Sequence, residues 1–167
     1  MYFSTVSPLP IFSIAVNTGF VKHPRCLKGV FVKEINMNEL FELARKAAEN
    51  AYAHYSKFRV GAALLASDGT ILTGCNVENR SFGLTICAER NAVLHGVNRG
   101  LRSFIALAVS TPDSENPVGP CGACRQVLSE FMEPSSPVIF GGSGKEKVET
   151  TIGLLYPFDS LHDLAGS

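Results

Sequence analysis

Two short stretches of the chain hold most of the residues that could do chemistry: "TICAERNAV" at 85–93 and "PCGACRQV" at 120–127. The first places Cys87 two residues before Glu89, and the second places Cys121 and Cys124 three residues apart. A cysteine is usually a small buried hydrophobe, and a glutamate is rarely buried without a partner. Packing alone therefore does not explain why two apolar stretches contain three cysteines and a glutamate.

The spacing of the cysteines favours a metal site. Cys121 and Cys124 stand at i and i+3 of a predicted helix start, so both sulfurs can point to one place. Cys87 begins another predicted helix, and a helix N-terminus favours the thiolate. Three thiolates leave one position on a zinc ion open, which is the catalytic arrangement, whereas four ligands close a structural site. We therefore predict one Zn²⁺ per subunit, held by these three cysteines.

A zinc site would give the two residues after Ala88 a task each. Glu89 lies near Cys87 but points in a different helical direction, so it can act as general acid and base beside a zinc-bound water. Arg90 follows Cys87 at i+3 and shares its face. Because three thiolates on a divalent ion make a net negative centre, the guanidinium would offset the excess charge. We assign proton transfer to Glu89 and charge tuning to Arg90.

The elements that must position these residues follow from hydrophobic periodicity and turn signals. Asn36 and Glu39 form a capping-box pattern before an apolar helical repeat, and "SDGT" at 67–70 separates two apolar runs as a β-hairpin would. The predicted segments are a helix from 36, a hairpin in 58–79, a helix at 87–100, a strand at 103–111, a helix at 120–133 and two strands in 137–155. This order predicts an α/β fold, a three-layer α/β/α arrangement with a five-stranded mixed sheet.

Composition excludes several classes of partner. The 167 residues carry 15 basic and 15 acidic groups. Four of the basic residues fall in 1–33, which has no acid, so the rest of the chain has 11 basic and 15 acidic groups and disfavours nucleic acid. No apolar run reaches the ~20 residues of a membrane-spanning helix. Five cysteines, an odd number, favour metal or catalytic thiols over a disulfide framework.

Two regions of different character divide the chain. Residues 1–33 have no persistent period and are interpreted as an extension that is disordered, a targeting segment or the product of a start codon placed too early. Residues 34–167 are predicted to form the catalytic domain. The expected location is cytoplasmic, and organelle targeting by 1–33 stays open.

The run "AYAHYSKFRVGAALLASDGTILTGCNVENRSFGLTICAERNAV" and the later "PCGACRQVLSEF" resemble the small, homotetrameric, zinc-dependent cytidine deaminases over roughly residues 37–160. The resemblance implies hydrolytic deamination of free cytidine and deoxycytidine in pyrimidine salvage, with zinc hydroxide attacking C4 and Glu89 shuttling protons. It also implies a homotetramer with shared active sites.

The same resemblance assigns residues to the substrate. Asn76 and Glu78 match the pair that binds the ribose hydroxyls, Phe58 matches the aromatic stacked on the base, and the Ala88 backbone would contact the pyrimidine. Phe82 and Phe158 match aromatics that neighbouring subunits lend to the site. The C-terminal "LLYPFDSLHDL" departs from the family's Leu-Leu-Pro-x-x-Phe, because its proline is shifted and its spacing is one residue shorter.

Three other hypotheses deserve comparison. "PCGAC" heading a helix after a strand is also similar to a thioredoxin-type dithiol, which leaves Cys87, Glu89 and Arg90 without a role. A structural zinc module that binds protein or nucleic acid conflicts with the acidic balance and the open fourth position. A deaminase of another aminopyrimidine or aminopurine, including antibiotic nucleosides, stays open. Cys75, on a strand before Asn76, is interpreted as a packing residue.

Overall fold

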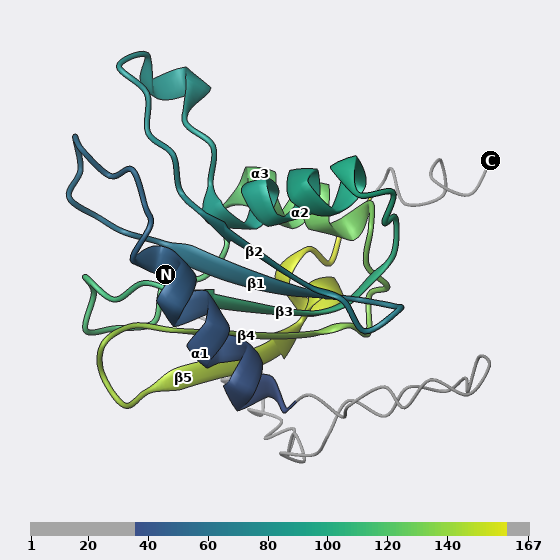
Figure 1. Cartoon of the computed structure of the whole chain (residues 1–167). Helices are drawn as coiled ribbons and strands as arrows, with labels where there is room; N and C mark the ends of the chain where they lie inside the picture. The colour runs from purple at the N-terminus through teal and green to yellow at the C-terminus, as the bar shows by residue number, and fades with distance from the viewer. Residues whose placement is uncertain (1–35, 160–167) are drawn as a thin grey trace, which may run out of the picture.

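A five-stranded mixed sheet forms the middle layer of the computed structural model, which describes residues 36–159 (Figure 1). The strand order is β2-β1-β3-β4-β5, and only β3 and β4 pair in parallel. The strands are β1 Gly61–Ala66, β2 Ile71–Cys75, β3 Phe104–Ser110, β4 Pro137–Gly141 and β5 Lys147–Thr151. The predicted five-stranded mixed sheet is confirmed. The expectation for residues 1–33 lies outside the described residues.

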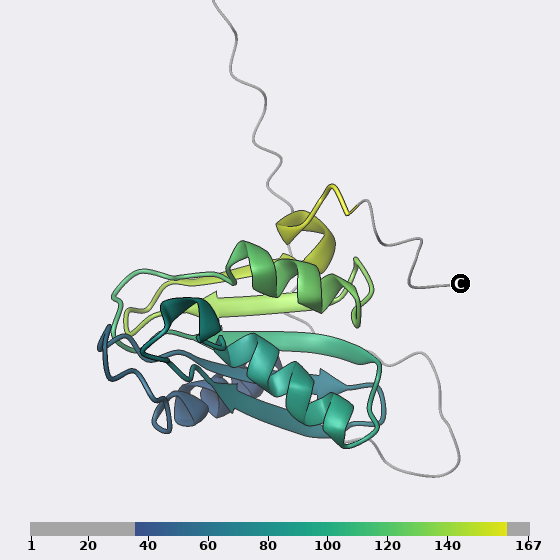
Figure 2. The same ribbon diagram turned by 90° about the horizontal axis from the view of Figure 1, so that it is seen from above.

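Helices cover both faces of this sheet, as the three-layer prediction requires. α1 lies on one face, and α2 and α3 lie side by side on the other, as the view from above shows (Figure 2). Two short elements were not predicted, the 3₁₀ turn η1 and the last helix α4. The bounds are α1 Met37–Ala48, η1 Phe82–Leu84, α2 Ala88–Asn98, α3 Gly122–Ser129 and α4 Ile152–Leu155.

The start of α1 and the β1–β2 turn form where the sequence signals them. Asn36 caps α1, although its Oδ1 accepts from the backbone N–H of Asn38, at 2.8 Å, and not from that of Glu39 as a capping box would have it. The turn places Gly69 at φ +89°, a backbone conformation that glycine adopts without strain. Asp68 Oδ1 accepts from the backbone N–H of Thr70 in the same turn.

The sequence of β1 is one apolar run because its side chains point alternately to two faces that are both covered by helices. All six residues are buried, since helices cover both faces of the strand. Ala63 and Leu65 join α1 in one core cluster, while Ala62 and Leu64 join the cluster beneath α2 and α3. The sheet therefore has a separate apolar core on each face, and the two cysteine-bearing helices pack on only one of these cores.

Two glycines let the helices approach the sheet closely. A Cβ built on Gly74 of β2 would lie 2.5 Å from the carbonyl oxygen of Ala88 and 2.5 Å from the backbone nitrogen of Ala92, so the first turns of α2 lie directly on this strand. Gly61 of β1 has the same relation to α1, where a Cβ would meet backbone atoms of Ala44 and Ala48. Among residues 36–159, no helix is long and apolar enough to cross a membrane.

Candidate active site

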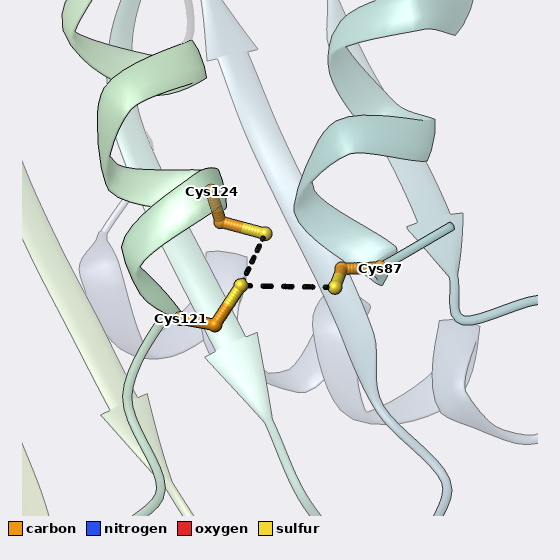
Figure 3. A group of neighbouring side chains, drawn as sticks. All are labelled: Cys87, Cys121 and Cys124. Atoms are coloured by element: carbon orange, nitrogen blue, oxygen red, sulfur yellow. Dashed lines mark hydrogen bonds between the residues drawn. The ribbon is translucent and has the colours of Figure 1, made fainter. Parts of the chain in front are cut away.

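Strand direction brings the two cysteine-bearing helices to one edge of the sheet. β1 is antiparallel to both β2 and β3, so β2 and β3 run the same way and end at the same edge. α2 follows β2 and α3 follows β3, so both helices begin near that edge. Cys87 is the N-cap of α2 and Cys121 the N-cap of α3, with Cys124 one turn into α3. Figure 3 shows the three side chains turned toward one another.

The three sulfurs have the spacing of ligands on one metal ion. Cys121 Sγ lies 3.5 Å from Cys124 Sγ and 3.9 Å from Cys87 Sγ, and all three atoms are within 4.8 Å of one another. A tetrahedral Zn²⁺ with Zn–S bonds of about 2.3 Å separates its sulfurs by roughly 3.8 Å. The cluster therefore fits zinc without rearrangement of the backbone. Cys75 is not part of the cluster; its Sγ donates to the carbonyl oxygen of Asn50.

The chain already favours negative charge at Cys87. Hydrogen bonding with Cys124 lowers the pKa of Cys87 to about 5, and the Arg90 guanidinium adds to this effect against the opposing effect of burial. The same hydrogen bond, together with burial, raises the pKa of the Cys124 thiol above its usual value. A thiolate at Cys87 that accepts from a neighbouring thiol is the state expected before a metal ion displaces the remaining protons.

Arg90 contacts the cluster as its i+3 spacing predicted. Its Nη2 donates to Cys87 Sγ at 3.4 Å and to the carbonyl oxygen of Thr85 at 3.1 Å, so two contacts fix the guanidinium beside the sulfur. Its Nε is buried and has no hydrogen-bond partner among the described residues. The Arg90 guanidinium therefore places a positive charge beside Cys87 Sγ, where three thiolate ligands would concentrate negative charge.

Glu89 lies in the first turn of α2 and is 3% exposed. Burial raises the pKa of its carboxyl, and the nearby charge of Cys87 acts in the same direction. A buried carboxyl whose pKa is raised in this way has the character of a group that exchanges protons with a bound molecule. Ala88, between it and Cys87, is fully buried.

Asn76 and Glu78 follow β2 and hold the neighbouring loop that carries Phe58. Asn76 is 7% exposed; its Oδ1 accepts from the backbone N–H of Val60, at 2.8 Å, and its Nδ2 donates to the carbonyl oxygen of Phe58, at 2.9 Å. The Glu78 carboxylate accepts from the backbone N–H of Tyr55, at 2.7 Å.

Ser56 completes this anchorage, since Glu78 also accepts from its backbone N–H and its hydroxyl. These bonds lower the pKa of Glu78, with the Ser56 hydroxyl as the largest cause. No sequence pattern indicated that Asn76 and Glu78, the two residues expected at the ribose, also bind their own chain.

The three predicted aromatic residues differ in exposure. Phe58 is half-buried, whereas Phe82 and Phe158 are 74% and 90% exposed. The ring of Phe82 meets that of Tyr55 edge to face, with centroids 5.8 Å apart. Among residues 36–159, no ring contact or hydrogen bond joins Phe82 or Phe158 to the three clustered cysteines.

Sequence reasoning missed two arginines that tie separate segments together. Arg59 forms an ion pair with Asp113, from Nη2 to Oδ1 at 2.6 Å. Arg125 donates from Nε to the carbonyl oxygen of Pro120, at 2.7 Å, and from Nη1 to that of Leu155, at 3.3 Å. Asp113 lies 54 positions from Arg59, and Leu155 lies 30 positions from Arg125, so no local pattern could have indicated these two contacts.

Comparison with known proteins adds independent findings. A family model described as the cytidine and deoxycytidylate deaminase zinc-binding region matches residues 35–140. A cytidine deaminase from Sporosarcina psychrophila is 51% identical over 123 residues, which are 74% of this chain and 90% of that protein. One from Halalkalibacterium halodurans is 45% identical over 118 residues, which are 71% of this chain and 89% of that protein.

A solved structure gives the same result. The crystal structure of cytidine deaminase from Burkholderia pseudomallei superposes with a TM-score of 0.71 at 43% identity, over 74% of this chain and 98% of that one. The region matched by the family model contains the cysteine cluster, Glu89, Arg90 and the loops that carry Phe58 and Glu78.

Proposed function

The chain belongs to the cytidine and deoxycytidylate deaminase family, and on this basis we propose that it converts cytidine and deoxycytidine to uridine and deoxyuridine by zinc-dependent hydrolysis, releasing ammonia. The observation that carries the proposal is the three-sulfur cluster with a buried carboxyl, that of Glu89, two residues after Cys87. A dithiol oxidoreductase would need two of these cysteines and would leave the third, Glu89 and Arg90 unused.

The zinc ligands in this proposal are Cys87, Cys121 and Cys124. Their S···S distances of 3.5 and 3.9 Å suit a tetrahedral ion. When bound, zinc supplies the Lewis acidity that activates the hydrolytic water at neutral pH. Arg90 keeps the thiolate-rich centre from becoming too negative, because its guanidinium contacts Cys87 Sγ directly.

Glu89 moves the protons of the reaction. Its carboxylate takes a proton from the attacking water and delivers it to N3 of the pyrimidine as the bond to C4 forms. It then takes the proton of the new hydroxyl on C4 and passes it to the amino group, which leaves as ammonia while the C4 oxygen becomes the carbonyl of the product. Its burial, at 3% exposed, keeps bulk water from competing for these protons. Each positioned transfer contributes about 10²–10⁴-fold to the rate.

The free nucleoside is bound by four residues, Phe58, Asn76, Glu78 and Ala88. The half-buried ring of Phe58 offers a stacking face for the base, and the backbone of Ala88 contacts the pyrimidine edge. Asn76 and Glu78 face the ribose hydroxyls while their remaining hydrogen bonds hold the loop of Phe58. The acidic balance of residues 34–167 suits a free nucleoside better than a nucleic acid.

Neighbouring subunits complete the site in a homotetramer. Phe82, Leu84 and Phe158 expose 74%, 65% and 90% of their surface, so their apolar side chains are available for contact with another subunit. In this arrangement Phe82 and Phe158 reach the active sites of other subunits. The enzyme works in the cytoplasm, where its unpaired thiols, Cys75 among them, stay reduced.

The decisive experiment incubates the zinc-loaded protein with cytidine, deoxycytidine and CMP and follows ammonia release. We expect turnover of both nucleosides and little of the nucleotide, and a tetramer by light scattering. Chelator-treated protein should lose deamination and regain it with zinc. Disulfide reductase activity in the metal-free protein, without deamination by the zinc form, would instead support the dithiol hypothesis.

A further inference from the structure

Arg59 and Asp113 join the loop of Phe58 to the segment that leads from β3 into α3. The Arg59 guanidinium contacts both carboxylate oxygens, with Nη2 2.6 Å from Oδ1 and Nε 3.0 Å from Oδ2. The backbone N–H of Arg59 also donates to Oδ2, at 2.8 Å. A carboxylate that receives a planar guanidinium and a backbone amide together fixes both the side chain and the main chain of its partner.

Asp113 itself stands on a rigid support. Thr111, which directly follows β3 and is 1% exposed, donates from its backbone N–H and from Oγ1 to the carbonyl oxygen of Gly141, at 2.9 and 3.2 Å. Ser114 then donates its backbone N–H to the carbonyl oxygen of Thr111, at 3.0 Å, and closes a turn around Asp113. The carboxylate is therefore fixed relative to the sheet, and the chain continues from this turn to Cys121.

Phe58 lies between this anchor and a strained residue. Lys57 has φ +60°, the single positive value for a non-glycine residue among those described, and such a conformation persists only where the surroundings enforce it. The backbone N–H of Phe58 donates to Ser56 Oγ, at 3.0 Å, and its carbonyl accepts from Asn76. Asn76 and Glu78 hold this loop from the β2 side, and Asp113 is the contact that holds it from the β3 side.

We infer that Asp113 is a positioning residue for Phe58: through Arg59 it fixes the base-stacking ring relative to the cysteine-bearing helix α3. The inference deepens the proposed function and rests on the stacking role given there to Phe58. Exposed ion pairs add little to global stability, and the Arg59 and Asp113 side chains are 46% and 24% exposed. The contribution of the pair is therefore expected in substrate binding, with only a small change in melting temperature.

The test replaces Asp113 by alanine and by asparagine, with Glu115→Gln as the matched control. Glu115 lies on the same loop and carries the same charge, and no hydrogen bond of its carboxylate occurs among residues 36–159. For Asp113→Ala we expect the loop arrangement that binds cytidine to fall to roughly one tenth of the population, which raises KM for cytidine about tenfold. The kcat and the zinc content should stay nearly unchanged. Asp113→Asn, which retains an oxygen for the Arg59 amide, should give a smaller rise, and the control none.

A double-mutant cycle with Phe58→Ala separates positioning from general damage. Because Asp113 acts through Phe58, Asp113→Ala should add less than about twofold to KM once the ring is gone. A full additional rise in that background, or an unchanged KM in Asp113→Ala, would overturn the inference while leaving the proposed function intact. If Phe58→Ala alone leaves KM unchanged, the stacking role fails and the inference with it.

Amide hydrogen exchange tests the anchoring without any activity. The N–H of Arg59 should exchange faster in Asp113→Ala than in the unaltered protein, since its acceptor is removed, while the N–H of Ala66 in the β1–β2 hairpin keeps its rate. An equal rate at Arg59 would overturn the inference even if the protein deaminates no nucleoside. Failure of deamination with faster exchange at Arg59 would instead reject the proposed function.

Discussion

The cysteine cluster stands on the first turns of two helices packed on the sheet, whereas the candidate nucleoside-binding residues stand on loops that side-chain hydrogen bonds hold in place. On the metal side, Cys124 is fully buried, and the two cysteine-bearing helices α2 and α3 contribute side chains to one core cluster. On the nucleoside side, Phe58 is half-buried and its neighbours Tyr55 and Ser56 are exposed. Regular backbone fixes one half of the site, and a few polar side chains fix the other.

This difference predicts two kinds of damage. Changes on the metal side should abolish chemistry or unsettle the helices, because zinc position depends on the helix starts. Changes on the nucleoside side should weaken substrate binding and leave zinc in place, because the loops contribute little to the core. The predictions below test this division, from the largest expected effect to the smallest.

Removal of a predicted zinc ligand should have the largest effect. Cys124→Ala should bind zinc too weakly to retain it through gel filtration, and turnover should fall by more than about 10³-fold, since metal activation is worth several kcal/mol. Metal analysis and ammonia release measure both losses. Cys75→Ala is the control, because Cys75 bonds Asn50 and lies outside the cluster. Retention of stoichiometric zinc by Cys124→Ala would remove this residue from the ligand set.

Loss of the proton-transfer group should leave the metal untouched. Glu89→Gln should retain zinc and lower kcat by about 10²–10⁴-fold, the usual contribution of a positioned general acid and base. Stopped-time assays of ammonia release with parallel zinc analysis separate the two properties. Near-normal turnover would show that another group moves the protons. Glu115→Gln, an exposed change of the same kind, serves as the control.

Helix placement can be tested with the two glycines that touch opposite helices. Gly74→Ala should push the first turns of α2 from β2, and Gly61→Ala should push α1 from β1, because each Cβ would meet helix backbone. Overpacking of this kind costs typically 1–3 kcal/mol of unfolding free energy, measured by urea denaturation. Only Gly74→Ala should also weaken zinc binding, in competition with a chelator. Equal zinc affinity in the two folded variants would contradict the dependence of the cluster on α2.

The cysteine cluster and the Arg90 contact could be predicted from the sequence because their determinants are local. The i, i+3 spacing of Cys121 and Cys124 and the i+3 relation of Arg90 to Cys87 are properties of a single helix turn, and the structure shows both contacts. The order of strands and helices followed from apolar runs and turn residues for the same reason. To predict that Cys87 lies near Cys121 and Cys124, it was enough to expect that α2 and α3 begin at the same edge of the sheet.

The nucleoside side could be predicted only in part. Resemblance alone gave Phe58, Asn76 and Glu78 their roles, and those roles stay predictions. The bonds that shape the loop join residues more than ten positions apart, such as Asn76 to Phe58 and Arg59 to Asp113. Side chains that bond across such separations leave no periodic pattern, so a single sequence could not indicate them.

The smallest predicted effect concerns the pH dependence of the loop anchor. The Arg59 guanidinium lowers the pKa of Asp113 below its usual value, so the pair stabilises the folded chain above the unfolded-state pKa of about 3.9. This contribution is lost as pH falls through the lower folded-state pKa. Asp113→Asn should therefore lower the unfolding free energy at pH 7 by less than about 1 kcal/mol, since the pair is partly exposed.

Urea denaturation of both proteins at pH 7 and near pH 3 measures this difference, which should shrink at the lower pH. Glu115→Gln should show no such convergence, because no hydrogen bond of that carboxylate occurs among the described residues. A loss of several kcal/mol in Asp113→Asn at pH 7 would place the anchor among the elements that hold the core. The division between a helix-built metal side and a separately anchored nucleoside side would then fail at Asp113, because one contact would serve both.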